Sequence, residues 1–162
     1  MTVAMAPALS QPGSYALLLT AKGRRDRLAI GARGALSLEP GHYVYLGSAF
    51  GPGGLGARLR HHLNEPRRLH WHIDYLRSAC ELQGAWLASA DRDLEHAWAT
   101  SLLALPQSRL PMPGFGSSDC QCSAHLVVIP AAVSWKKIGL VLAADGHAPE
   151  YMSVGRLCRQ LS

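Results

Sequence analysis

The order of apolar and polar positions predicts a small set of buried strands. An aromatic and aliphatic run follows the breaker Pro12-Gly13, and a second run, Tyr43 to Ser48, alternates so that Tyr45 and Gly47 share one face. A short hairpin is predicted where Gly31 to Gly34 separates two apolar stretches. The predicted strands are Ser14–Thr20, Leu28–Ile30, Ala35–Leu38, Tyr43–Ser48, Glu81–Ala88 and Ala124–Ile129.

A glycine-rich turn at residues 51–54 leads into the first predicted helix, Leu55 to Leu63. The turn is flexible enough for its backbone to approach a ligand closely. In the helix, leucines four residues apart form a buried stripe. Arg58 and His62, which are also four residues apart, are expected to lie side by side at the rim of the core.

The clearest helical pattern runs from Asp91 to Leu105. Glu95 falls at the edge of its apolar stripe and is expected to face a cleft, whereas His96 points away. An acid in the first turn also suits the helix dipole. The remaining predicted helices are His70–Leu76, Ser134–Ala144 and Pro149–Leu161.

Length and composition favour one ordinary folded domain. The chain has 162 residues, of which 48% are apolar and 17% charged, which excludes an intrinsically disordered class. Its apolar runs are far shorter than the roughly 20 residues of a membrane-spanning helix. Residues 1–12 lack the basic start of a signal peptide, so a cytoplasmic location is expected. The same residues are expected to form a flexible tail. We expect residues 13–129 to form the domain and residues 130–162 to form a helical extension packed on it.

Positive charge is concentrated in one part of the chain. The formal net charge is +5, and residues 20–77 hold ten lysines and arginines against four acids. Such a basic segment predicts a polyanionic partner, with nucleic acid favoured over a membrane surface. The candidate contacts to a nucleic-acid backbone are Lys22, Arg24, Arg25, Arg60, Arg67 and Arg68.

Two groups of possible metal ligands have ordinary alternatives. Cys120, Cys122 and His125 offer thiolate and imidazole groups for zinc, but structural zinc usually takes four ligands with two residues between paired cysteines. Zinc at Cys120 and Cys122 is therefore not favoured over buried thiols. His70, His72 and Asp74 would share one face of a strand, whereas on a helix only His70 and Asp74 would meet.

Four short motifs in sequence order carry a resemblance to a known family. Gly13-Ser14-Tyr15 and Tyr45-Leu46-Gly47, followed by Arg58 and His62, resemble the GIY-YIG nuclease superfamily. The series GHYVYLGSA, GGLGARLRHHL, HWHIDYL and GFGSSDCQCSAHL is similar to its Uri-type branch, whose members are sometimes fused to DNA-repair glycosylases. The likeness covers residues 13–129. The 29 residues between the two tyrosines are a spacing typical of this branch alone.

The resemblance implies a fold, a reaction and a set of residues. It implies a small α/β (α+β) domain in which a mostly antiparallel three-stranded sheet lies between helices. The implied reaction is metal-dependent hydrolysis of nucleic acid, with DNA favoured over RNA and DNA repair as a candidate process. The resemblance further implies one Mg²⁺ or Mn²⁺ ion. The implied catalytic residues are Tyr15, Tyr45, Arg58 and His62, the implied metal ligand is Glu95, and further candidates are Gly47, His70, His72, Asp74, Asp119 and His125.

These residue types suit phosphodiester hydrolysis, which needs an activated water and neutralisation of the phosphate charge. A tyrosine base, with an ordinary pKa near 10, needs a nearby cation. Arg58 can clamp a phosphate, and Glu95 offers the oxygen ligand that Mg²⁺ prefers. His62 is either a proton relay or the leaving-group acid, and the choice between the tyrosines is open.

Each residue also has a structural interpretation. Tyr15 and Tyr45 can be ordinary sheet aromatics with their hydroxyl groups at the surface. Arg58 can be a solvated helix residue, and Glu95 can act only by its favourable interaction with the helix dipole. His61 is expected at the surface. A nuclease is therefore the leading hypothesis, with a non-catalytic nucleic-acid-binding module and a zinc-stabilised interaction domain as the alternatives.

Overall fold

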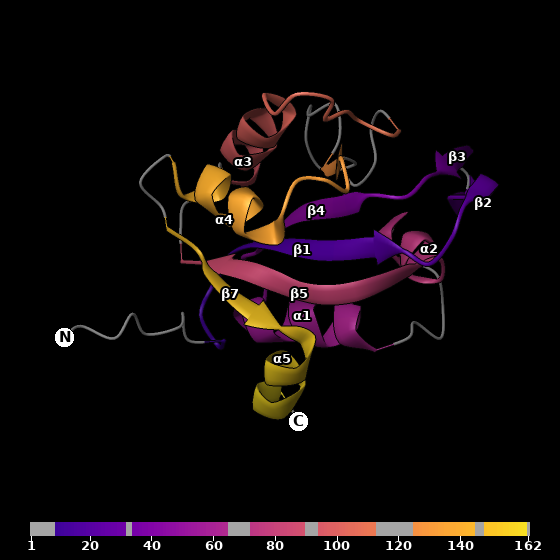
Figure 1. The fold of residues 1–162 in the computed structure, drawn as a ribbon. Helices are drawn as coiled ribbons and strands as arrows, with labels where there is room; N and C mark the ends of the chain where they lie inside the picture. The colour runs from indigo at the N-terminus through magenta and orange to yellow at the C-terminus, as the bar shows by residue number, and fades with distance from the viewer. Residues whose placement is uncertain are drawn as a thin grey trace.

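An antiparallel sheet of five strands forms the centre of the molecule, in the order β6-β4-β1-β5-β7 (Figure 1). The computed structural model describes residues 9–31, 34–64, 72–89, 94–112, 125–144 and 148–161. The strands are β1 (Gly13–Ala21), β2 (Arg25–Ala29), β3 (Ala35–Leu38), β4 (His42–Ala49), β5 (Cys80–Ala88), β6 (Leu126–Ile129) and β7 (Glu150–Ser153). The helices are α1 (Gly54–Leu63), α2 (His72–Arg77), α3 (Leu94–Leu103), α4 (Trp135–Ala143) and α5 (Val154–Leu161).

The predicted α+β class is confirmed, and so is the hairpin, which forms from β2 and β3 as a separate two-stranded sheet. The three central strands β4, β1 and β5 are those with the strongest apolar runs. The sheet exceeds the predicted three strands because β6 pairs with β4 at one edge and β7 pairs with β5 at the other.

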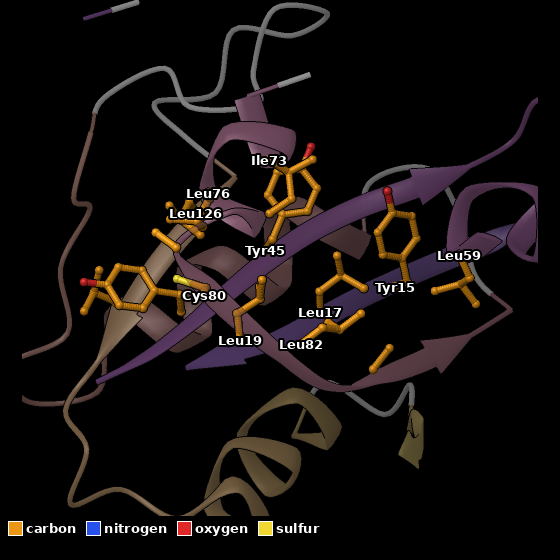
Figure 2. Packing of buried hydrophobic residues seen from close by; sticks show 14 of the residues in the cluster. Tyr15, Leu17, Leu19, Tyr45, Leu59, Ile73, Leu76, Cys80, Leu82 and Leu126 are labelled. Carbon is orange, nitrogen blue, oxygen red and sulfur yellow. The ribbon is translucent and has the colours of Figure 1, made fainter. Parts of the chain in front are cut away.

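The central strand β1 is buried on both faces, and its alternating side chains supply two separate cores. Tyr15, Leu17 and Leu19 face α1, α2 and α5, and Figure 2 shows the packing on this side. Ala16 and Leu18 face α3 and α4. The helix residues in the two cores are Leu55, Leu59, Ile73, Leu76 and Leu157 on the first side, and Leu94, Trp98, Leu102, Ile138 and Leu142 on the second.

The prediction of one helix from Pro149 to Leu161 is wrong in its first half. Residues 150–153 form strand β7, and the helix α5 begins only at Val154. Tyr151 pairs with Trp86 and Met152 with Ala85 along the edge of β5. Hydrogen bonding to this open edge outweighs the weak helical preference of the short segment.

The end of the predicted N-terminal tail is bonded to α1. The backbone carbonyl of Gln11 accepts a hydrogen bond from the N–H of Leu55 at 3.0 Å, and that of Leu9 accepts one from Gly56 at 2.6 Å. These carbonyls occupy N–H groups that a helix leaves unsatisfied at its start. The close approach that the glycine-rich turn allows is therefore made by residues 9–11 of the chain itself.

None of the described helices is both long enough and apolar enough to cross a membrane.

Candidate functional site

Two tyrosines lie on neighbouring strands and on the same face of the sheet. Tyr15 of β1 is opposite Gly47 of β4, and Tyr45 of β4 is opposite Leu17. Both rings belong to the core beneath α1 and are 2% and 8% exposed, and Figure 2 shows them on one side of the strands. The predicted pair of motif tyrosines is therefore brought together.

Gly47 makes room for one of these rings. A Cβ atom at Gly47 would lie 2.5 Å from both Cζ and the hydroxyl oxygen of Tyr15. Such a separation is far inside van der Waals contact. The glycine is thus required by the position of the Tyr15 ring.

His62 lies close to both tyrosines. Its Nε2 is 2.9 Å from the hydroxyl oxygen of Tyr15, and its ring centroid is 6.0 Å from that of Tyr45 in an edge-on arrangement. The expectation that His62 lies at the rim of the core is wrong, because it is 1% exposed. The buried stripe of α1 follows positions i, i+4 and i+7 through Leu55, Leu59 and His62, and Leu63 is only half-buried.

Burial keeps both partners of this hydrogen bond neutral. Desolvation, with a smaller contribution from the neighbouring His61, lowers the pKa of His62 to about 3. Desolvation also raises the pKa of Tyr15 well above its ordinary value, with contributions from Tyr45 and Glu95 that raise it and one from Arg58 that lowers it. At neutral pH a phenol therefore meets a neutral imidazole, and the imidazole tautomer decides which of them donates.

The charge of Arg58 acts on both partners of this hydrogen bond. Its guanidinium affects the pKa of Tyr15 and that of His62, and the side chain is half-buried on α1 one turn before His62. The structure thus brings the predicted tyrosines, Arg58 and His62 into one neighbourhood, to which the charge of Glu95 is also coupled.

A second layer of polar contacts holds the end of α1. Arg77 donates from Nε to the backbone oxygen of His62 at 3.0 Å and from a terminal nitrogen to the oxygen of Cys80 at 3.3 Å. His61 Nε2 lies 2.8 Å from a carboxylate oxygen of Asp74, which is 2% exposed on α2. His61 is therefore not a simple surface residue. Sequence reasoning missed Arg77 because its partners are backbone atoms of other elements.

Glu95 is close to two histidines. Its Oε1 lies 3.6 Å from Nε2 of His96 and 3.8 Å from Nε2 of His125, and the two imidazole centroids are 5.7 Å apart. One potential ligand atom from each residue lies within 4.8 Å of the others. The expectation that His96 points away is wrong: at the first turn of α3 its side chain lies beside that of Glu95 and meets His125, which precedes β6.

Carboxylate oxygen and imidazole nitrogen are both ligands of divalent cations in proteins. The backbone oxygen of His125 accepts a hydrogen bond from the N–H of Leu46 at 2.8 Å, which joins the residue before β6 to β4 next to Gly47. The helix α3 packs on the face of the sheet opposite to the two tyrosines, and the charge of Glu95 still affects the pKa of Tyr15. We refer to Glu95, His96 and His125 as the carboxylate–histidine cluster.

The basic candidates do not all lie near this site. Lys22, Arg24 and Arg25 are exposed after the end of β1, and that end is six residues and thus about 20 Å along the strand from Tyr15. Arg60 is exposed on α1 and donates to the backbone oxygen of Leu161 at 3.3 Å. Six further candidates lie outside the described residues, namely Arg67, Arg68, His70, Asp119, Cys120 and Cys122. His72 is described, is half-buried at the start of α2, and is not part of the carboxylate–histidine cluster.

A family model described as "Domain of unknown function DUF123" matches residues 14–140. The chain belongs to the DUF123 family. The match spans β1 to α4, so the DUF123 region includes both tyrosines, His62 and the carboxylate–histidine cluster, whereas β7 and α5 follow it. Comparison with curated proteins and with solved structures gave no match.

Proposed function

We propose that this DUF123 protein is a metal-dependent nuclease of the GIY-YIG type, which hydrolyses phosphodiester bonds in nucleic acid. DNA is favoured over RNA as its substrate. The observation that carries the proposal is the 2.9 Å contact between Tyr15 and His62, with Arg58 and Glu95 coupled to the same phenol. A pure packing role for Tyr15 does not need a buried imidazole at its hydroxyl. The phenol, imidazole, guanidinium and carboxylate are groups that phosphodiester hydrolysis uses.

In this proposal Tyr15 is the base. A water proton passes to the Tyr15 oxygen while the Tyr15 proton passes to Nε2 of His62, so that no phenolate has to persist in the buried site. His62 does not suit the role of leaving-group acid, because with a pKa of about 3 it carries no extra proton at neutral pH. The same low pKa makes it a weak proton acceptor, so the imidazolium formed in the relay is short-lived. Tyr45, whose ring lies edge-on to that of His62, then holds the imidazole in position.

Arg58 is the residue proposed to bind the scissile phosphate. Its planar guanidinium can form two parallel hydrogen bonds to phosphate oxygens, and its place on α1 is fixed relative to His62. Glu95 would hold a divalent cation, which when bound would offset the negative charge of the substrate. Lys22, Arg24 and Arg25 would contact the nucleic-acid backbone further away.

One observation favours the alternative of a non-catalytic nucleic-acid-binding module. Tyr15 is 2% exposed, and burial raises its pKa, which opposes the loss of its proton. Such a module would keep salt-dependent binding through its basic residues and release no product.

A cleavage assay separates the two functions. Labelled single-stranded, duplex, mismatched, flap and junction DNA, together with RNA, are incubated with the protein in Mg²⁺, Mn²⁺ or EDTA. We expect metal-dependent product that is lost in Tyr15→Phe and Glu95→Gln. Tyr43→Phe is the matched control, because the Tyr43 hydroxyl donates to the backbone oxygen of Glu39 instead. Binding without product in any metal would refute the nuclease and support the module.

A further inference from the structure

The carboxylate–histidine cluster contains more donor groups than a Mg²⁺ site needs. Mg²⁺ is usually held by one or two carboxylates, with water and substrate oxygens completing its shell. Here one carboxylate converges with two imidazoles, one adjacent to it on α3 and one just before β6. Imidazole nitrogen suits iron, nickel, copper and zinc, whereas magnesium prefers carboxylate, carbonyl and water oxygens.

The distances within the cluster suit a shared cation better than direct hydrogen bonds. The separations of 3.6 and 3.8 Å between Glu95 Oε1 and the two imidazole nitrogens exceed the roughly 2.7–3.2 Å of an N–H···O hydrogen bond. Two ligands on one metal ion at about 2.0–2.2 Å each are separated by about 3–3.6 Å. A small inward movement of the side chains would complete the coordination.

Burial adds a second argument. The side chains of Glu95 and His125 are only 10% and 9% exposed, and a bound cation would stabilise a carboxylate that burial disfavours. The His96 side chain is 37% exposed, so the cluster is open to solvent on that side. A cation could enter there and retain positions for water or a phosphate oxygen, as catalytic metal sites with three protein ligands do.

We propose that Glu95, His96 and His125 form a three-ligand site that selects a first-row transition metal over Mg²⁺. This inference deepens the proposed nuclease function, on which its catalytic meaning rests, but metal binding itself can be measured without turnover. The two histidines are the residues that distinguish it from a site built on Glu95 alone.

The test is a titration of the metal-free, full-length protein with Co²⁺, followed by visible absorption, which reports nitrogen and oxygen ligands directly. We expect one Co²⁺ per chain, little displacement by about a hundredfold excess of Mg²⁺, and about tenfold or greater loss of affinity in His96→Ala and His125→Gln. His42→Ala is the matched control, since His42 is a half-buried histidine on β4 outside the cluster. Circular dichroism of each variant checks its fold.

The outcomes distinguish this site from the nuclease function. A protein that binds Co²⁺ through these residues but cuts no substrate supports the site and refutes the nuclease. Unchanged Co²⁺ affinity in a folded His96→Ala protein overturns the site, as does displacement of Co²⁺ by an equal concentration of Mg²⁺. If Mg²⁺-dependent cleavage persists in those cases, the nuclease function stands without the two histidines.

Discussion

The ring of Tyr15 lies directly against the backbone of Gly47, with no space between them for a methyl group. The two residues are opposite each other on paired strands, so their relative position is fixed by the sheet and not by a flexible loop. The same ring places its hydroxyl group 2.9 Å from His62. Any change at Gly47 is therefore transmitted to the central hydrogen bond of the site.

Replacement of Gly47 by alanine should displace the Tyr15 ring. The added Cβ would meet Cζ at 2.5 Å, so the ring must move and lengthen its contact with His62. Overpacking of this kind costs about 1–3 kcal/mol, which urea unfolding can measure. Gly51→Ala is the control, because no heavy atom lies within 4 Å of a Cβ there.

A double-mutant cycle isolates the cause. In a Tyr15→Ala background the ring is gone, so the further change Gly47→Ala should cost much less than it does in the wild-type protein. Equal costs in the two backgrounds would mean that Gly47 is needed for some other reason, and that the clash with Tyr15 does not set the penalty.

The neutral, buried imidazole of His62 should make stability depend on pH. The pKa of His62 falls from 6.5 in the unfolded chain to about 3 in the folded protein, so the unfolded state binds more protons between these values. Stability is therefore fully present above about pH 6.5 and is lost as pH falls toward 3. Between pH 7 and pH 5 the expected loss from this residue is about 2 kcal/mol.

Urea unfolding of the wild-type protein and of His62→Gln at several pH values measures this contribution. The amide keeps a polar group at the position but does not titrate in this range. The variant should be less stable at neutral pH and should show a shallower decline toward pH 5. Parallel pH profiles would contradict a depressed His62 pKa and point to other titrating groups.

The fold could be predicted where the signal is local. The strands β1 and β4 and the helix α1 each have their own apolar pattern, and the structure places them within one or two residues of the expected bounds. Strand β7 could not be predicted, because residues 150–153 become a strand only by pairing with β5, more than sixty residues earlier in the chain. Propensity within so short a segment is weaker than such tertiary pairing.

The candidate site divides in the same way. Tyr15, Tyr45 and Gly47 were predictable because strand alternation and a motif fix their faces. His96 was misplaced because helical spacing compares residues within one helix, whereas its neighbour His125 arrives from another element. Arg77 binds backbone oxygens, which leave no trace in a pattern of side-chain types.

Arg77 should stabilise the end of α1 and, through it, the position of His62. Its two hydrogen bonds join the last turn of α1 to the start of β5. Arg77→Met keeps the apolar part of the side chain but removes both donors, at an expected cost of about 1–3 kcal/mol in urea unfolding. Arg27→Met on the exposed strand β2 is the control and should change stability by less than about 0.5 kcal/mol.

Replacement of Arg58 by lysine should separate charge from geometry. Lysine keeps one positive charge near Tyr15 but cannot form the paired hydrogen bonds of a guanidinium, so cleavage should fall by about tenfold or more while the unfolding midpoint changes little. Arg27→Lys, exposed on β2, controls for the loss of a guanidinium elsewhere and should cut at the wild-type rate. If Arg58→Lys cuts as fast as the wild-type protein under single-turnover conditions, then Arg58 acts only through its charge, and its proposed hydrogen bonds to the scissile phosphate do not contribute to the rate.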